Sequence, residues 1–175
     1  TSRWFIIVQY LTEKLMTFAT SDSLKWSVSS RPLFAGDIPV PGKVAQVRDD
    51  NDAVLGITSP SYTVFQNSSL RELIQPMVDE GLLTITNIGY LGVGAKVFIQ
   101  AQMAEEFTVV GETHQARITL LNSHDGSAAL AAGVTDQRVI CSNTFAMAMT
   151  DMDTRFRHNL SIHENALGIT EVVNY

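Results

Sequence analysis

The fold of this chain is decided by one stretch, Leu120-Leu121-Asn122-Ser123-His124-Asp125-Gly126-Ser127. An apolar pair is followed by polar residues, and the Asp-Gly pair is a strong signal for a tight hairpin turn. We therefore expect one strand to end here and a second strand, over residues 127–134, to return beside it. A second distinctive string follows further along the chain, Arg138-Val139-Ile140-Cys141-Ser142-Asn143-Thr144.

Apolar and polar residues alternate with a period of two before this stretch. The alternation over residues 83–102 and 107–122 predicts closely spaced strands. Their short connections favour an antiparallel meander over crossovers through helices.

The first third of the chain shows the same signals at shorter range. A strand is predicted over residues 24–29, and a hairpin over residues 43–57 with its turn at Asp49–Asp52. Residues 34–42 contain two glycines and two prolines and are predicted to be a loop. A further short strand is predicted over residues 62–66.

The spacing of apolar residues and the capping residues predict four helices. They are expected over residues 4–18, 69–81, 135–150 and 161–173. Ile6-Ile7 leaves a strand open as the alternative for the first, and Pro76 is expected to kink or shorten the second. In the third, Cys141 and Phe145 fall on the face that we expect to be buried.

This order of elements predicts an α+β fold, a curved antiparallel sheet with a β-β-β-α core and helices packed on one face. Residues 1–22 are expected to form an amphipathic N-terminal segment and residues 23–175 a single domain. The amphipathic segment has two open roles, packing between subunits and packing into the core of its own chain.

Composition limits the function. The chain has 175 residues and one cysteine, so no internal disulfide can form, which favours a reducing, cytoplasmic setting. No cysteine or histidine pairs stand at zinc-ligand spacing, so no metal is expected. No apolar run is long enough to span a bilayer, so no membrane association is expected. The net charge of -6 opposes general attraction to nucleic acid, although it leaves room for a local basic groove.

Six strings stand in the order of a known family. They are Val54–Ile57, Tyr62–Asn67, Gly92–Phe98, Asn122–Ser127, Arg138–Thr144 and Arg157-His158. Over residues 26–167 the chain resembles the phage/plasmid-like protein family, which is catalogued as a domain of unknown function (number nine-three-two). The resemblance implies a protein of phages, plasmids and their bacterial hosts, and it leaves the activity open.

A three-stranded meander followed by a helix with an arginine near its start is similar to the core of the single-strand annealing proteins, the group of Redβ and the eukaryotic Rad-fifty-two protein. The similarity implies a protein that binds single-stranded DNA and pairs complementary strands in homologous recombination. It implies a ring or filament of identical subunits that uses neither ATP nor another cofactor and is not an enzyme. The glycines of residues 89–94 are followed by Ala95-Lys96-Val97, which does not complete a phosphate-binding loop.

Binding of single strands needs cations for the phosphates and flat side chains for the bases. The predicted DNA-binding residues are Lys96, Arg117, His124, Arg138, Arg155, Arg157 and His158. The densest basic cluster is Arg155–His158. For this cluster a solvated connection between helices is the structural alternative.

Three other interpretations remain open. His124 and Asp125 with a neighbouring serine resemble parts of a hydrolase, but adjacent residues point in different directions, so we predict no catalytic residue. His158 and His163 supply only two metal ligands. The alternative function is that of an acidic interaction or counter-defence protein of a mobile element that binds host proteins.

Overall fold

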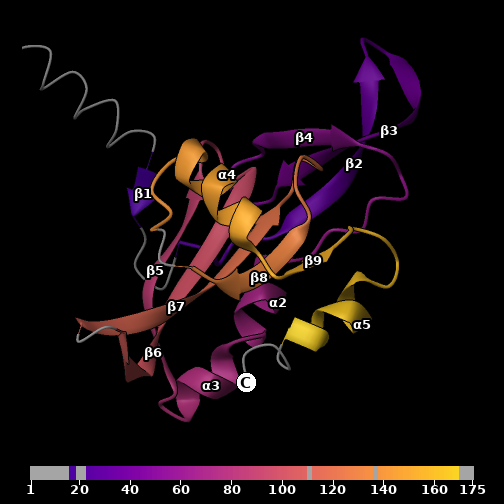
Figure 1. Cartoon of the computed structure of the whole chain (residues 1–175). Helices are drawn as coiled ribbons and strands as arrows, with labels where there is room; N and C mark the ends of the chain where they lie inside the picture. The colour runs from indigo at the N-terminus through magenta and orange to yellow at the C-terminus, as the bar shows by residue number, and fades with distance from the viewer. Residues whose placement is uncertain (1–15, 19–22, 110–111, 136–137, 170–175) are drawn as a thin grey trace, which may run out of the picture.

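Figure 1 shows the chain as a computed structural model, which describes residues 16–18, 23–109, 112–135 and 138–169. The strands are β1 (Met16–Phe18), β2 (Val28–Ala35), β3 (Ile38–Arg48), β4 (Val54–Thr58), β5 (Leu83–Leu91), β6 (Lys96–Val109), β7 (Glu112–Ser123), β8 (Leu130–Val134) and β9 (Thr154–Phe156). The helices are α2 (Asn67–Glu72), α3 (Gln75–Asp79), α4 (Ser142–Asp151) and α5 (Ile162–Ala166). The α+β class is therefore confirmed.

The strands form two antiparallel sheets. One has six strands in the order β1-β5-β6-β7-β8-β9, and the other has three in the order β2-β3-β4. The meander predicted over residues 83–122 is confirmed, as is the return of the chain after Asp125-Gly126 into β8. The prediction of one sheet is wrong. Strands β2, β3 and β4 pair with one another through tight hairpins, and residues 59–82 then carry the chain away before β5 begins.

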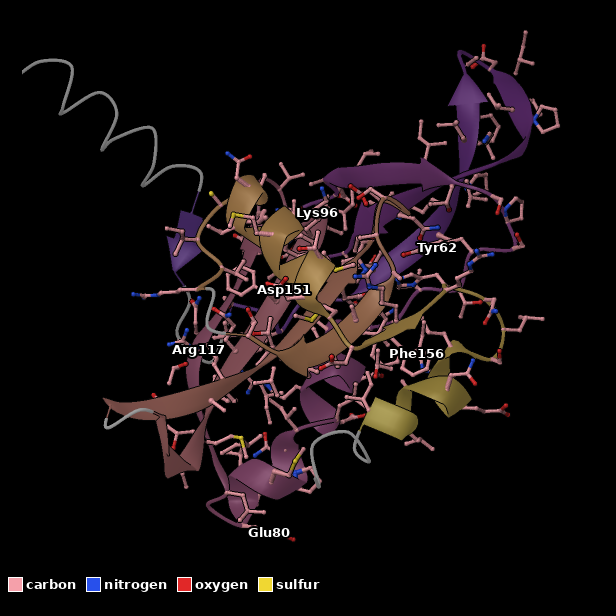
Figure 2. The ribbon with its side chains drawn as sticks, in the orientation of Figure 1. Tyr62, Glu80, Lys96, Arg117, Asp151 and Phe156 are labelled. Carbon is pink, nitrogen blue, oxygen red and sulfur yellow. The ribbon has the colours of Figure 1, made fainter. Side chains whose placement is uncertain are left out.

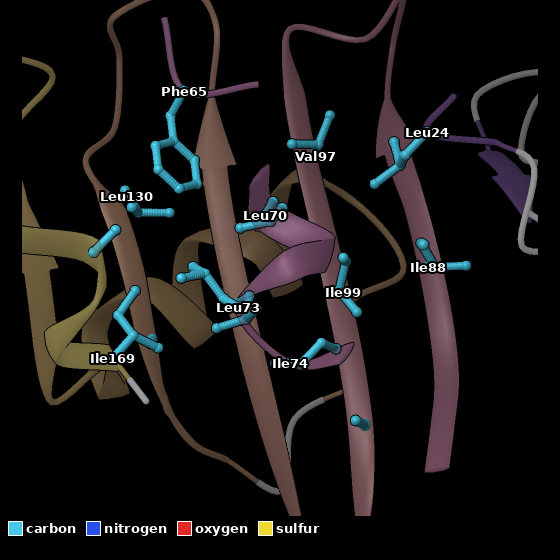
Figure 3. Close-up of a cluster of buried hydrophobic side chains, with 14 of the residues drawn as sticks. Leu24, Phe65, Leu70, Leu73, Ile74, Ile88, Val97, Ile99, Leu130 and Ile169 are labelled. Carbon is cyan, nitrogen blue, oxygen red and sulfur yellow. The ribbon is translucent and has the colours of Figure 1, made fainter. Parts of the chain in front are cut away.

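Helices cover both faces of the six-stranded sheet, so the prediction of helices on one face is also wrong. Alternate residues of a strand point to opposite faces. Val97, Ile99 and Leu120 pack with the α2–α3 segment and α5, as Figure 3 shows in part. Phe98 and Leu121 point the other way and pack against α4. Consecutive apolar residues in β6 and β7 thus point to opposite faces, and each face is buried by helices.

Residues 34–42 form a hairpin rather than the predicted loop. Gly36 and Asp37 make its turn, and Figure 1 shows the β2–β3 hairpin projecting from the rest of the molecule. Pro39 and Pro41 fit within β3 because β4 pairs with β3 only over Val44–Val47. The outer part of β3 therefore has an edge where no amide donor is needed.

The predicted break at Pro76 is confirmed, because α2 and α3 are separate helices and Pro76 lies in the first turn of α3. Residues 62–66, predicted as a strand, have no regular structure. Helix α4 begins at Ser142 rather than near residue 135. Cys141 is consequently its half-buried N-cap, paired with Thr144, rather than a buried packing residue.

The late start of α4 has a cause in the sheet below it. The buried Gln100 Oε1 accepts hydrogen bonds from Val139 N and Asn87 Nδ2, both at 2.9 Å. Asn87 Nδ2 also donates to Val139 O at 2.9 Å, and Gln100 Nε2 donates to Thr119 Oγ1 at 2.9 Å. These bonds take up both backbone groups of Val139, so the peptide cannot use them within a helix.

Both ends of the chain lie partly outside the described residues. Of the helix predicted over residues 4–18, only residues 16–18 are described, and they form β1, paired with β5. Of the helix predicted over residues 161–173, Ile162–Ala166 forms α5. The domain boundary after residue 22 stays a prediction. In the described part of the chain, no helix combines the length and apolar character needed to cross a membrane.

We expect Gln100→Ala to lower the free energy of unfolding by about 2–4 kcal/mol, because it removes the partner of the buried Val139 N, the bond to Thr119 Oγ1 and one of the two bonds of Asn87 Nδ2. Gln75→Ala is the matched control, since Gln75 makes one exposed hydrogen bond to Asp79, and its effect should stay below about 0.5 kcal/mol. Urea unfolding followed by circular dichroism measures both. Equal effects of the two substitutions would contradict the structural role given to Gln100.

Candidate functional site

The end of β7 and the residue after it attach the irregular segment 62–66 and Asn67, the first residue of α2, to the six-stranded sheet. Asn122 Nδ2 donates to Phe65 O at 3.0 Å, and Tyr62 Oη donates to Ser123 O at 2.6 Å. His124 Nε2 lies 2.9 Å from Asn67 Oδ1. Residues 122–124, at the start of the predicted turn, therefore bind the neighbouring segment through hydrogen bonds.

His124 is fully buried and neutral. Asn67 Nδ2 donates to Trp26 O, so Asn67 Oδ1 must accept and His124 must donate from Nε2. Burial, with a further contribution from the nearby His158, lowers the pKa of His124 to about 4. The ring also meets Trp26 edge-on, with a centroid distance of 5.6 Å. His124 thus has no access to a phosphate and no charge at neutral pH.

His158 joins the same segment from the other side. Its Nδ1 lies 3.0 Å from Thr63 O, and Thr63 N donates to His158 O at 3.2 Å. Because a carbonyl only accepts, the hydrogen of the imidazole lies on Nδ1. Burial lowers the pKa of His158, which leaves the ring neutral. Its ring stacks on Tyr62 with centroids 4.6 Å apart and planes at 15°.

An open groove of about 330 Å³ lies beside this aromatic pair. Its lining residues are Tyr62, Gly126, Ser127, Ala128, Ala129, Arg157 and His158. The wall made by the β7–β8 turn is fixed by Ser127 N donating to Asp125 Oδ1 at 2.8 Å and by Ser123 Oγ donating to Ala128 O at 2.8 Å. Gly126 has a φ of 73°, which a side chain would strain. Small residues thus form one wall and aromatic rings the other.

Arg157 supplies the groove's positive charge. It is exposed, and it is the lining residue that is cationic at neutral pH, because His158 is neutral. Burial and the charge of Asp125 raise the pKa of Tyr62, so its hydroxyl stays protonated. The groove therefore presents one guanidinium beside a neutral aromatic pair.

Three of the predicted DNA-binding residues lie elsewhere. Lys96 begins β6, and its Nζ is 5.8 Å from the centre of the Phe145 ring of α4. Arg138 lies on the irregular segment before α4, not at a helix start as predicted. Figure 2 shows Arg117, on β7, on the opposite side of the molecule from Tyr62. The structure does not bring these three residues to the groove.

Arg155 has a structural partner instead of an open position. Its Nη2 donates to Met149 O at 2.6 Å and to Thr150 O at 3.1 Å, at the C-terminal end of α4. The last carbonyls of a helix have no partner within the helix, so they can accept these bonds. The positive charge of Arg155 also interacts favourably with the negative end of the helix dipole. Phe156, between the two arginines, packs against the core, and Arg155 is not among the residues that line the groove. Of the predicted basic cluster, Arg157 and His158 therefore lie in the groove, and Arg155 bonds to the end of α4.

Ser123, His124 and Asp125 do not bond to one another as a catalytic relay would. Ser123 Oγ bonds to Ala128, His124 bonds to Asn67, and Asp125 bonds to Ser127 N. Nor do the described parts of the chain contain a group of three or more histidine, cysteine, aspartate or glutamate side chains placed to hold a metal ion. His163 stacks on Phe65 at 5.0 Å.

Sequence reasoning missed Tyr62 and the small residues Ala128 and Ala129 as parts of the site. Tyr62 stood within a supposed strand, where an aromatic residue signals packing. The available signal was its place in one of the six strings, next to a Ser-Pro turn. Only the tertiary pairing of residues 62–63 with His158 reveals the groove.

Comparison with known proteins gives one match. A family model described as a domain of unknown function (DUF932) matches residues 54–173, more than half of the chain. The matched range contains every groove residue. No curated protein and no solved structure matches the chain.

The low pKa of His124 makes stability depend on pH. The pKa is about 4 in the folded chain and 6.5 for an ordinary histidine, so this contribution is complete above pH 6.5 and is lost as the pH falls toward 4. Between about pH 7 and about pH 5, the wild type should lose roughly 2 kcal/mol more stability than His124→Gln. Urea unfolding at both pH values measures the difference, and parallel pH profiles of the two proteins would contradict it.

Proposed function

The chain belongs to the family described as a domain of unknown function (DUF932), and we propose that it binds single-stranded DNA and promotes the pairing of complementary strands. One observation carries the proposal: Tyr62, Arg157 and His158 line the same groove. Proteins that bind single strands combine aromatic faces for bases with cations for phosphates. The groove offers both within one small surface.

Each part of the groove has a role in this proposal. The Tyr62–His158 pair contacts a base, and Arg157 contacts the adjacent phosphate. The groove is open, which suits an extended strand better than a small molecule that needs enclosure. A duplex keeps its bases stacked inside, so only a single strand can place a base against these rings.

The rest of the function follows the resemblance to annealing proteins. In this proposal the protein uses no ATP, other cofactor or catalytic residue. It assembles as a ring or filament of identical subunits in the cytoplasm of a bacterium that carries a phage or plasmid. Gly92–Ala95, the glycine-containing turn between β5 and β6, packs against Trp26 at Gly94, which accounts for glycine there without a phosphate ligand.

A second candidate function is binding of host proteins as a counter-defence factor. Phe34 and Ile38, on the projecting β2–β3 hairpin, are 56% and 71% exposed. Exposed apolar side chains and a net charge of -6 suit a protein partner better than a nucleic acid. This candidate becomes the better one if the folded protein leaves single strands unbound at about 50 mM salt.

We expect Arg157→Ala to weaken binding of a labelled single-stranded oligonucleotide by roughly tenfold and to lower the slope of log affinity against log salt by about 0.7. It should also slow the annealing of complementary labelled strands. Arg117→Ala is the matched control for loss of one guanidinium, because Arg117 lies on β7, on the opposite side of the molecule from Tyr62 (Figure 2). Fluorescence anisotropy over a salt series measures the slope, and equal slopes for both variants would remove Arg157 from the site.

Arg155→Ala should behave differently from Arg157→Ala. Because Arg155 bonds to carbonyls at the end of α4, its loss should lower the free energy of unfolding by about 1 kcal/mol. The salt slope for single-stranded DNA should stay that of the wild type. A reduced slope with unchanged stability would instead place Arg155 on the phosphate path.

A further inference from the structure

The two edges of the three-stranded sheet differ in their protection. At the β2 edge, the Gln66 side chain accepts from Val28 N at 3.0 Å and donates to Val28 O at 2.8 Å. Pro32 removes a further donor from β2. The β4 edge, Val54–Thr58, contains neither a proline nor a charge, and in the described part of the chain β4 pairs only with β3.

Strand β4 also carries exposed apolar side chains. Val54 is 57% exposed and Ile57 is 53% exposed. Native proteins usually blunt a free edge with charges, prolines or a covering element. An uncharged edge with two large apolar side chains at its surface therefore fits a strand that receives a partner strand.

The charges around β4 favour a second copy of this chain as that partner. Near the Val54 end lies the turn with Asp49, Asp50 and Asp52, whose three negative charges face the two positive charges of Arg31 and Arg48. This cluster of five side chains therefore carries about one net negative charge. Near the Thr58 end lies the exposed Lys43, next to Val44, which pairs with Thr58.

Antiparallel pairing of two β4 strands about a two-fold axis would bring opposite charges together. The acidic turn of each copy would lie near Lys43 of the other, whereas parallel pairing would place the two acidic turns side by side. We propose that β4 is the edge through which two copies of this chain associate, joining their small sheets into one continuous antiparallel sheet. Such a contact uses the same patch on both copies, as a two-fold axis requires, and it closes at two copies. The ring or filament of the proposed function would therefore need a second, different contact between such dimers.

The proposed contact lies close to the groove but does not depend on it. A Cβ at Gly56 of β4 would lie 2.5 Å from Asp125 Cα, so β4 touches the β7–β8 turn directly. Glycine at this position lets the two approach. In a dimer, the β7–β8 turn of each copy, which forms one wall of its groove, would thus lie beside the dimer interface.

Sedimentation velocity of the full chain without DNA tests this proposal apart from the proposed function. The wild type should dimerise, and Ile57→Lys should raise the dimer dissociation constant at least about tenfold. Leu82→Lys is the matched control, because Leu82 is 51% exposed and precedes β5 rather than lying on the small sheet. Its dissociation constant should stay within about twofold of the wild-type value.

Hydrogen exchange provides a second readout that needs no substitution. The amide hydrogens of β4 should exchange more slowly as the protein concentration rises, while those of β2 should be unaffected. A wild type that stays monomeric up to about 1 mM would overturn the proposal. So would a dimer that Ile57→Lys leaves intact, or β4 exchange that does not vary with concentration.

Discussion

The attachment of residues 62–67 to the end of β7 is the constraint on which the rest of the structure depends. Residues 62–66 carry the chain from the small sheet to α2, which begins at Asn67, and they have no regular secondary structure. Asn122 lies in β7 and His124 directly follows the last residue of that strand, and their side chains reach Phe65 and Asn67. The bond of the Tyr62 hydroxyl to Ser123 O fixes one end of the segment, and the bond of His124 to Asn67 fixes the start of α2 at the other.

A similar attachment exists on the opposite face of the sheet. There Gln100 and Asn87 bind the backbone of Val139 and set where α4 begins. Both attachments use neutral amide or imidazole groups, which are costly to bury unless they are paired. Since each alternative packing would leave several of these groups unpaired, the networks favour one arrangement of the segments. Because the buried histidines of these networks are neutral, Arg157 is the positive charge that lines the groove. The proposed nucleic-acid contact therefore relies on stacking as much as on charge.

The sequence was sufficient for features that depend on local chemistry. Period-two alternation gave the meander, Asp125-Gly126 gave the β7–β8 turn, and Pro76 separated α2 from α3. It was insufficient where tertiary contacts outweigh local preference. The hairpin at residues 34–42 depends on pairing across its turn, and residues 138–141 stay out of a helix because Gln100 binds Val139. The candidate site shows the same division. Arg157 and His158 were predicted to act together, but the partner ring of Tyr62 comes from a distant segment, and the bonds of Arg155 to α4 have no local signature.

Photochemical cross-linking tests the central claim most directly, because it reports which residues lie against the bases. A single-stranded oligonucleotide with photoreactive bases would be irradiated with the full chain, and the linked peptides identified by mass spectrometry. The account predicts links to Tyr62 and to residues 126–129 and 157–158, which line the groove. Links confined to peptides with Lys96, Arg117 or Arg138, or efficient linking that Arg157→Ala does not reduce, would contradict it.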